Sequence, residues 1–534
     1  MTSQAPPAFA PAFAPVPPSH RLDALDVLRG FALVGICIAN VEFFNRPVAE
    51  AGDGIAPGLH GLDWLVAFLV AYLVSGKFWT IFSLLFGMGF ALMLERARSA
   101  GRPFLAVYGR RTAVLGLFGL LHYLLLWSGD ILISYAFGAL ALILILFARG
   151  RWMLGALAVC LVLAQVPGFG VAGWPVTPIV FAGLVGLYLR AGRRAPFALA
   201  AIVPGSLMLL AAVLDFMRGA GELGSLLAIG AALVLLGLLA WVVEQPPALR
   251  PLRAGVAVFM LAYGLSALDG GLRYLAPRPG PGTGPGPASD AASAARAPAD
   301  AASDSGRRQL ERMEQAAQEK QVLTNGDYAQ AVAMRLDHLG ARLRDESGFI
   351  VVGVSVFLVG VWFVRSSIIV NAGAHLPLLR RLAVGGIGCG VGLGLASSLI
   401  STARPPGADD QGYDLAHALL TLGSLPASLG YVAAVLLALH SGGVLARVRV
   451  LAPFGRMALS NYLMQSLVLA LLFYAHGLGL WGMPRAQQVA LALLLCALQI
   501  GLSHWWLARF QYGPLEWVWR ALTYLQRPPL RRAP

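Results

Sequence analysis

Long runs of apolar residues, separated by short polar segments, occupy most of the chain and predict membrane-spanning helices. A helix needs about 20 predominantly apolar residues to cross the hydrocarbon core of a bilayer. The pattern therefore predicts an all-α fold, a polytopic integral membrane helical bundle with about 14 apolar segments, of which roughly 10–14 are true spans. The approximate segments are 26–44, 63–94, 111–127, 130–147, 152–167, 175–190, 197–215, 224–243, 254–272, 348–366, 382–402, 414–440, 453–475 and 486–508.

Composition agrees with a membrane protein, because 58% of the 534 residues are hydrophobic and only 12% are charged. The net charge of +14 does not indicate a nucleic-acid partner, since the arginines lie in short loops without interleaved aromatic residues. We therefore expect the lipid bilayer as the main partner. The four cysteines lie in apolar runs and predict small core residues, with neither disulfides nor a metal site. They are Cys37, Cys160, Cys389 and Cys496.

The charge of the loops alternates along the chain and predicts the orientation in the membrane. One set of loops carries Arg96, Arg98, Arg102, Arg110, Arg111, Arg149, Arg151, Arg190, Arg193, Arg194, Arg250, Arg253, Arg380, Arg381, Arg447 and Arg449. The other set carries Glu50, Asp53, Asp130, Asp215, Glu222, Asp409 and Asp410. Arginine-rich loops face the cytoplasm under the positive-inside rule. We thus expect a multi-pass protein of a bacterial inner (plasma) membrane with both termini in the cytoplasm.

The same pattern predicts one long outer loop. Its first part is rich in Pro, Gly and Ala, and its second part is polar with helical spacing and a break at Asn325-Gly326. The N-terminal residues are rich in Pro and Ala without a basic n-region, so we expect a tail and not a signal peptide. The expected organisation is a disordered cytoplasmic tail (1–20), N-terminal transmembrane helices (21–272), a periplasmic loop, disordered and then amphipathic helical (273–347), C-terminal transmembrane helices plus an interfacial helix (348–525), and a basic cytoplasmic tail (526–534).

The second apolar segment, 63–94, is too long for one ordinary span. Ser75-Gly76-Lys77 could divide it into an interfacial piece and a spanning piece. Lys77 is one of two lysines in the chain. Its position fits either a polar cavity or a break at the membrane interface with a snorkelling side chain.

The first apolar segment contains an ion pair and an amide. Asp26 and Arg29 share one helix face, and Asn40 lies ~21 Å further along the axis at ~1.5 Å per residue. Ionisable groups at the edge of a bilayer usually face protein or a wet cavity. The simpler interpretation is that Arg29 anchors the helix at the interface with Asp26 as its partner.

A histidine and an aspartate flank a tight turn at 121–132. His122 lies inside one helix and Asp130 begins the next. If the two converge, the histidine can act as a base and the aspartate can orient it. The alternatives are an interhelical hydrogen bond for His122 and an N-terminal cap for Asp130.

Polar residues also begin the helix near residue 455. Asn461 and Gln465 are an i, i+4 pair, and Arg456 lies one turn earlier. They could bind a ligand or bond neighbouring helices. Further on, Gly513-Pro514 starts a short amphipathic helix that carries Glu516, which could pair with Arg520, Arg29 or Arg456. The chain has no Walker loop, Rossmann glycine fingerprint, HExxH or GxSxG.

Six ordered runs resemble the YeiB-like membrane proteins, the domain-of-unknown-function 418 family. The resemblance extends from about residue 21 to 525. The runs are LDVLRGFALVGICIAN (25–40), GKFWTIFSLLFGMGF (76–90), LHYLLLWSGDIL (121–132), NGDYAQAVAMRL (325–336), GRMALSNYLMQS (455–466) and FQYGPLEWVWRALTY (510–524).

The opening run also resembles a wider group of membrane acyltransferases that includes heparan-α-glucosaminide N-acetyltransferase. That resemblance implies acyl-CoA as a cytosolic co-substrate, an acceptor on the outer side, and Asn40 near an active-site histidine. His60 occupies a comparable place, whereas His122 belongs to the YeiB-like run, so either could be the key histidine.

Three functions follow as hypotheses. The first is a transmembrane acyltransferase that passes an acyl group from acyl-CoA to an envelope glycan or lipid. Arg29 and Arg456 would hold the phosphates. His122 would act as base towards an outer hydroxyl or amine, Asp130 would orient it, and Asn40 would polarise the acyl carbonyl. The second is a transporter or exporter with Lys77, Asp26 and Glu516 along its path. The third is a non-catalytic envelope scaffold that uses the outer loop. The sequence does not indicate an oligomeric state.

Overall fold

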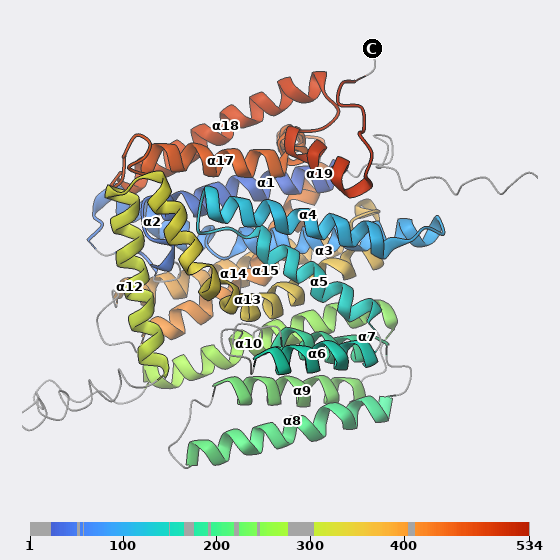
Figure 1. Cartoon of the computed structure of the whole chain (residues 1–534). Coiled ribbons are helices and arrows are strands. Elements are labelled where there is room, and N and C mark those ends of the chain that lie inside the picture. The colour runs from blue at the N-terminus through green and yellow to red at the C-terminus, as the bar shows by residue number, and fades with distance from the viewer. Residues whose placement is uncertain are drawn as a thin grey trace, which may run out of the picture.

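Helices make up nearly all of the described chain in a computed structural model (Figure 1). The structure describes residues 23–50, 54–56, 58–148, 150–164, 176–190, 194–217, 224–242, 246–275, 304–403 and 412–532. Within these residues no strand forms, apart from one isolated bridge between Phe510 and Arg531. The predicted N-terminal tail and the Pro/Gly/Ala-rich part of the long loop lie outside the described residues.

The helices follow the apolar segments closely. They are α1 (Asp23–Asn40), α2 (Gly61–Leu73), α3 (Lys77–Ser99), α4 (Phe104–Leu125), α5 (Leu132–Phe147), α6 (Gly150–Ala164), α7 (Val176–Arg190), α8 (Arg194–Met217), α9 (Gly224–Val242), α10 (Arg250–Leu275), α12 (Asp304–Asn325), α13 (Tyr328–Arg365), α14 (Leu376–Ala403), α15 (Tyr413–Leu439), α16 (Ala452–Arg456), α17 (Ala458–Phe473), α18 (Arg485–Arg509) and α19 (Pro514–Tyr524). Most run along one common direction, whereas α12 lies across one end of the bundle and α19 lies near the other end (Figure 1).

The predicted class, a helical membrane bundle, is confirmed, but the predicted number of spans is not. In the described part of the chain, eight helices are long and apolar enough to cross a membrane. A ninth span is possible if the helices before and after residue 457, which meet at 77°, count as one. Four other helices, α5, α7, α8 and α9, contain shorter apolar stretches of 10–17 residues, less than the ~20 that a span requires.

The break predicted in the second apolar segment is present. Gly76 has a φ of +78°, a conformation that favours glycine, and it separates α2 from α3. Lys77 does not snorkel, because its side chain is fully buried. Its Nζ points at α14, where a methyl group on Gly394 would lie 3.0 Å from it, and no residue in the described part hydrogen-bonds to it.

The structure differs from the predicted boundary at residue 347. α13 continues without interruption from Tyr328 to Arg365, so the polar part of the loop and the next apolar segment form one helix of 38 residues. Asp327 and Gln330 begin it with a capping box. At ~1.5 Å per residue α13 is about 57 Å long, well beyond the ~30 Å of a hydrocarbon core. α12 and the start of α13 pack together at one end of the bundle, which we call the hairpin end.

Two glycines allow α3 and α13 to cross with their backbones in contact. A methyl group on Gly87 of α3 would overlap the carbonyl oxygen of Phe357, and one on Gly360 of α13 would overlap that of Leu84. Small residues at such crossings let membrane helices approach closely. Next to this contact, Phe86 stacks on Phe357 with ring centroids 4.9 Å apart.

Gly87→Ala should therefore destabilise the protein, although alanine is normally the better helix former. The added methyl must push α13 away, which we expect to lower the free energy of unfolding by roughly 1–3 kcal/mol. Gly89→Ala is the matched control, because nothing lies within 4 Å of a methyl group at that position. It should be neutral or stabilising by up to about 1 kcal/mol. Equal melting temperatures of the two purified variants in detergent would contradict the packing role of Gly87.

Candidate functional site

His122 and Asp130 meet in a buried pair between α4 and α5. His122 Nδ1 lies 2.6 Å from Asp130 Oδ2, and neither side chain is exposed. The other oxygen of Asp130 accepts a 2.8 Å hydrogen bond from the backbone N–H of Ile133. Asp130 therefore caps α5 and also orients His122. His122 Nε2 is buried and has no hydrogen-bond partner in the described part of the chain.

α13 holds the turn that carries Asp130. Arg342 Nη2 donates to the carbonyl oxygen of Asp130 at 2.9 Å and to Ser134 Oγ at 3.2 Å. Arg342 also pairs with the fully buried Glu346, which accepts a 2.8 Å hydrogen bond from Ser134. Arg342 and Glu346 were not among the candidate residues predicted from the sequence. Their i, i+4 spacing next to an apolar segment was the available signal.

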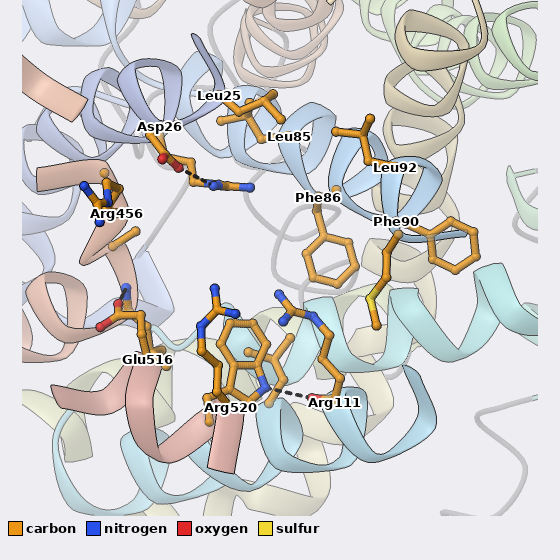
Figure 2. A pocket seen from close by; sticks show the side chains of 18 of the residues that line it. Leu25, Asp26, Leu85, Phe86, Phe90, Leu92, Arg111, Arg456, Glu516 and Arg520 are labelled. Carbon is orange, nitrogen blue, oxygen red and sulfur yellow. Dashed lines mark hydrogen bonds and ion pairs between the residues drawn. The ribbon is translucent and has the colours of Figure 1, made fainter. Parts of the chain in front are cut away.

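A cavity of about 780 Å³ lies between the first helices and the C-terminal helices (Figure 2). Residues of α1, α3, α4, α5, α16, α17, α18 and α19 line it. Its volume falls within the ~300–1,000 Å³ that is usual for small-molecule sites. Leu85, Phe86, Phe90 and Leu92 of α3 form an apolar wall (Figure 2).

Positive charge gathers around the cavity. Its lining contains two carboxylates, Asp26 and Glu516, against six arginines, an excess of four positive charges. The arginines are Arg29, Arg96, Arg102, Arg111, Arg456 and Arg520. Such a lining favours an anionic ligand, and guanidinium groups match phosphate oxygens in geometry.

Specific contacts hold part of this charge in place. Arg29 Nη1 bonds to Asp26 Oδ1 at 2.7 Å. The Arg111 guanidinium lies 3.8 Å from the centre of the Trp519 ring, which is a cation–π contact. Arg111 and Arg520 point into the opening from the side opposite Asp26 (Figure 2).

The cavity extends from the arginines to the neighbourhood of His122. On α3 its lining runs from Ser99 to Phe82, 17 residues or about 25 Å apart. At the far end it is lined by Tyr135 and Tyr462. The Tyr462 ring lies 5.1 Å from the His122 ring, so one side chain separates His122 from the cavity. The sequence run contains Tyr462, but no sequence signal distinguished it from its neighbours.

Glu516 joins α19 to α17. Its carboxylate accepts hydrogen bonds from the backbone N–H groups of Leu459 (2.8 Å) and Ser460 (3.0 Å) and from Ser460 Oγ (2.6 Å). Burial raises the pKa of Glu516, and the hydrogen bonds oppose that rise. A carboxylate at a helix N-terminus is also favoured by the helix dipole. Glu516 thus fixes α19 over the cavity.

Asn461 and Gln465 bond to α18 and do not line the cavity. Asn461 Nδ2 donates to Ser503 Oγ at 3.0 Å, and Gln465 Nε2 donates to Gln499 Oε1 at 2.9 Å. These contacts correspond to the alternative interpretation, hydrogen bonding between helices.

The remaining candidates lie apart from the cavity. Asn40 ends α1 and is partly buried, whereas His60 is exposed just before α2. Lys77, at the break before α3, does not line the cavity either. The structure therefore brings together Asp26, Arg29, Arg456 and Glu516 around the cavity, whereas His122 and Asp130 lie outside its lining, beyond Tyr462. No group of three metal-ligating side chains occurs among the described residues.

These features define a polytopic helical membrane protein with an arginine-lined cavity beside a buried His–Asp pair. Residues 363–526 match the family described as "Protein of unknown function (DUF418)". The YeiB-like resemblance found in the sequence is confirmed by this match over the C-terminal part of the chain. The wider resemblance to membrane acyltransferases stays a prediction.

The chain is also similar to proteins that are themselves described as uncharacterized. The "Uncharacterized protein YxaH" of Bacillus subtilis (strain 168) is 25% identical over 520 residues, which cover 96% of this chain and 97% of that protein. The "Uncharacterized protein YeiB" of Escherichia coli (strain K12) is 36% identical over 121 residues, 22% of this chain and 29% of the relative. No solved structure matches the chain.

Glu516→Ala should loosen α19 and lower the stability of the protein. The change leaves two backbone N–H groups and one hydroxyl without their acceptor, at a cost of roughly 1–3 kcal/mol. Glu516→Gln keeps one acceptor oxygen and should lose less. Glu95→Ala, at an exposed position, serves as the control and should stay within about 0.5 kcal/mol. A melting temperature of Glu516→Ala equal to that of the control would contradict the role of the cap.

Proposed function

We propose that the protein is a transmembrane acyltransferase that takes an acyl group from acyl-CoA and passes it to a glycan or lipid of the cell envelope. One observation carries this proposal: a single cavity has arginines along its lining and ends one side chain from a His–Asp pair. The arginines suit the phosphates of CoA, and the apolar wall of α3 suits the rest of a thioester.

The proposed orientation follows from the positive-inside rule. Two neighbouring segments would face the cytoplasm, where acyl-CoA is present. They are the last turn of α3, which carries Arg96, and the loop between α3 and α4, which carries Arg102. The hairpin end would face the outside of the inner membrane, and both termini would be cytoplasmic. His122 and Asp130, in the half of the bundle nearer the hairpin end, would then be the groups closest to an outer acceptor.

The chemistry assigns separate roles to the two nitrogens of His122. Nδ1–H donates to Asp130, which leaves the lone pair on Nε2. An acceptor hydroxyl or amine would add to the thioester carbonyl carbon while Nε2 takes its proton. The C–S bond of the adduct then breaks, and the proton passes to the CoA thiolate. Tyr462 lines the cavity and also packs on His122. A rotation of the Tyr462 side chain would therefore open His122 to the cavity.

The geometry supports the alternative function, a transporter or exporter, less well than it supports the acyltransferase. It requires Lys77, Asp26 and Glu516 along one route, but Lys77 does not line the cavity that the two carboxylates share. We therefore favour the acyltransferase.

His122→Gln should abolish most acyl transfer. The change removes the basic nitrogen, and loss of a general base typically costs 10²–10⁴ in rate. The assay is transfer of radiolabelled acyl groups from acyl-CoA into envelope glycan or lipid by the purified protein in liposomes. His60→Gln, at an exposed position, is the matched control and should keep its rate within about twofold. Transfer retained by a double His60→Ala, His122→Ala variant would contradict both histidine assignments.

A further inference from the structure

Gly89 occupies a special place on the apolar wall of the cavity. It lies on α3 and lines the cavity, and a methyl group built on it would meet no atom within 4 Å. Gly87, two residues earlier, is in backbone contact with α13. Two neighbouring glycines of one helix thus differ: the absence of a side chain at Gly87 makes room for a helix, and at Gly89 it leaves empty space inside the cavity.

Gly89 lies near the middle of the part of α3 that lines the cavity. Arg96 and Phe82, which both line the cavity on α3, each lie seven residues from Gly89, or about 10 Å along the helix. A ligand that runs along α3 from Arg96 towards Phe82 passes this level. The apolar side chains of Phe86, Phe90 and Met93 surround it on the same helix. A chain that passes here is therefore in apolar surroundings.

We infer that Gly89 is a specificity-determining residue, which keeps the middle of the cavity open so that one anionic amphiphile can place its phosphates at the arginines and its hydrocarbon chain past α3. This inference rests on the proposed function, in which the amphiphile is a long-chain acyl-CoA. It goes further by assigning the chain to the α3 wall and by naming the residue that limits its passage.

Gly89→Phe tests the inference by filling the space without a clash at its Cβ. The control is Gly392→Phe, because Gly392 of α14 is exposed, lies outside the cavity and also has no atom within 4 Å of an added methyl. Binding of CoA and of palmitoyl-CoA is measured by calorimetry on the full chain in nanodiscs. Any partition of palmitoyl-CoA into lipid is the same for both variants.

We expect Gly89→Phe to lose only the part of the affinity that the hydrocarbon chain of palmitoyl-CoA contributes. Wild type and Gly392→Phe should bind palmitoyl-CoA at least roughly tenfold more tightly than CoA, since its chain is buried. In Gly89→Phe this advantage should fall below about threefold, while the affinity for CoA stays within about twofold. Undiminished binding of palmitoyl-CoA by Gly89→Phe would overturn the inference.

Dodecyl phosphate separates this inference from the proposed function. If wild type binds neither CoA ligand but binds dodecyl phosphate, and Gly89→Phe weakens that binding, the acyltransferase proposal fails and the role of Gly89 stands. If no anionic amphiphile binds, both fail. Should Gly89→Phe not fold, Gly89→Cys replaces it: palmitoyl-CoA should protect the new thiol from a methanethiosulfonate reagent and CoA should not. Equal labelling with both ligands would overturn the inference.

Discussion

The backbone contact between α3 and α13 is the constraint on which the rest of the structure depends. α3 supplies the apolar wall of the cavity, and α13 holds the turn that carries Asp130. Gly87 and Gly360 bring the two helices together without side chains between them. The stack of Phe86 on Phe357 then fixes the rotation of the wall against α13. Because water does not drive association between helices inside a bilayer, such close packing has to stabilise the bundle.

The charged side chains of the cavity are compatible with this packing because several of them have partners inside the protein. Asp26 neutralises Arg29, Trp519 covers Arg111, and the N-terminus of α17 satisfies Glu516. A charged group in a low-dielectric interior is costly unless such partners are present. The lining as a whole still contains more arginines than carboxylates. The site thus combines a positive potential with a preformed apolar wall.

The sequence predicted the fold class, the break at Gly76 and the family, because apolar runs, glycine and ordered motifs are local signals. It left open whether His122 and Asp130 meet, and the structure shows that they do. It could not predict which polar residues share a cavity. Asn461 and Gln465 have the same residue types and spacing as a ligand site would, and only the position of α18 shows that they bond a helix. Tyr462 and Arg342 depend on contacts across more than a hundred residues, which periodicity does not reveal.

The uninterrupted course of α13 has a consequence for how the chain can vary in length. Arg342, which supports Asp130, and Gly360, which contacts α3, are 18 residues apart, or about five full turns, and so lie on one face of the helix. Inserting a single residue between them would rotate one group relative to the other by about 100°. The Asp130 turn and the α3 contact would then no longer be reached together. A substitution between these positions leaves their relative rotation unchanged, whereas an insertion or deletion of one residue alters it.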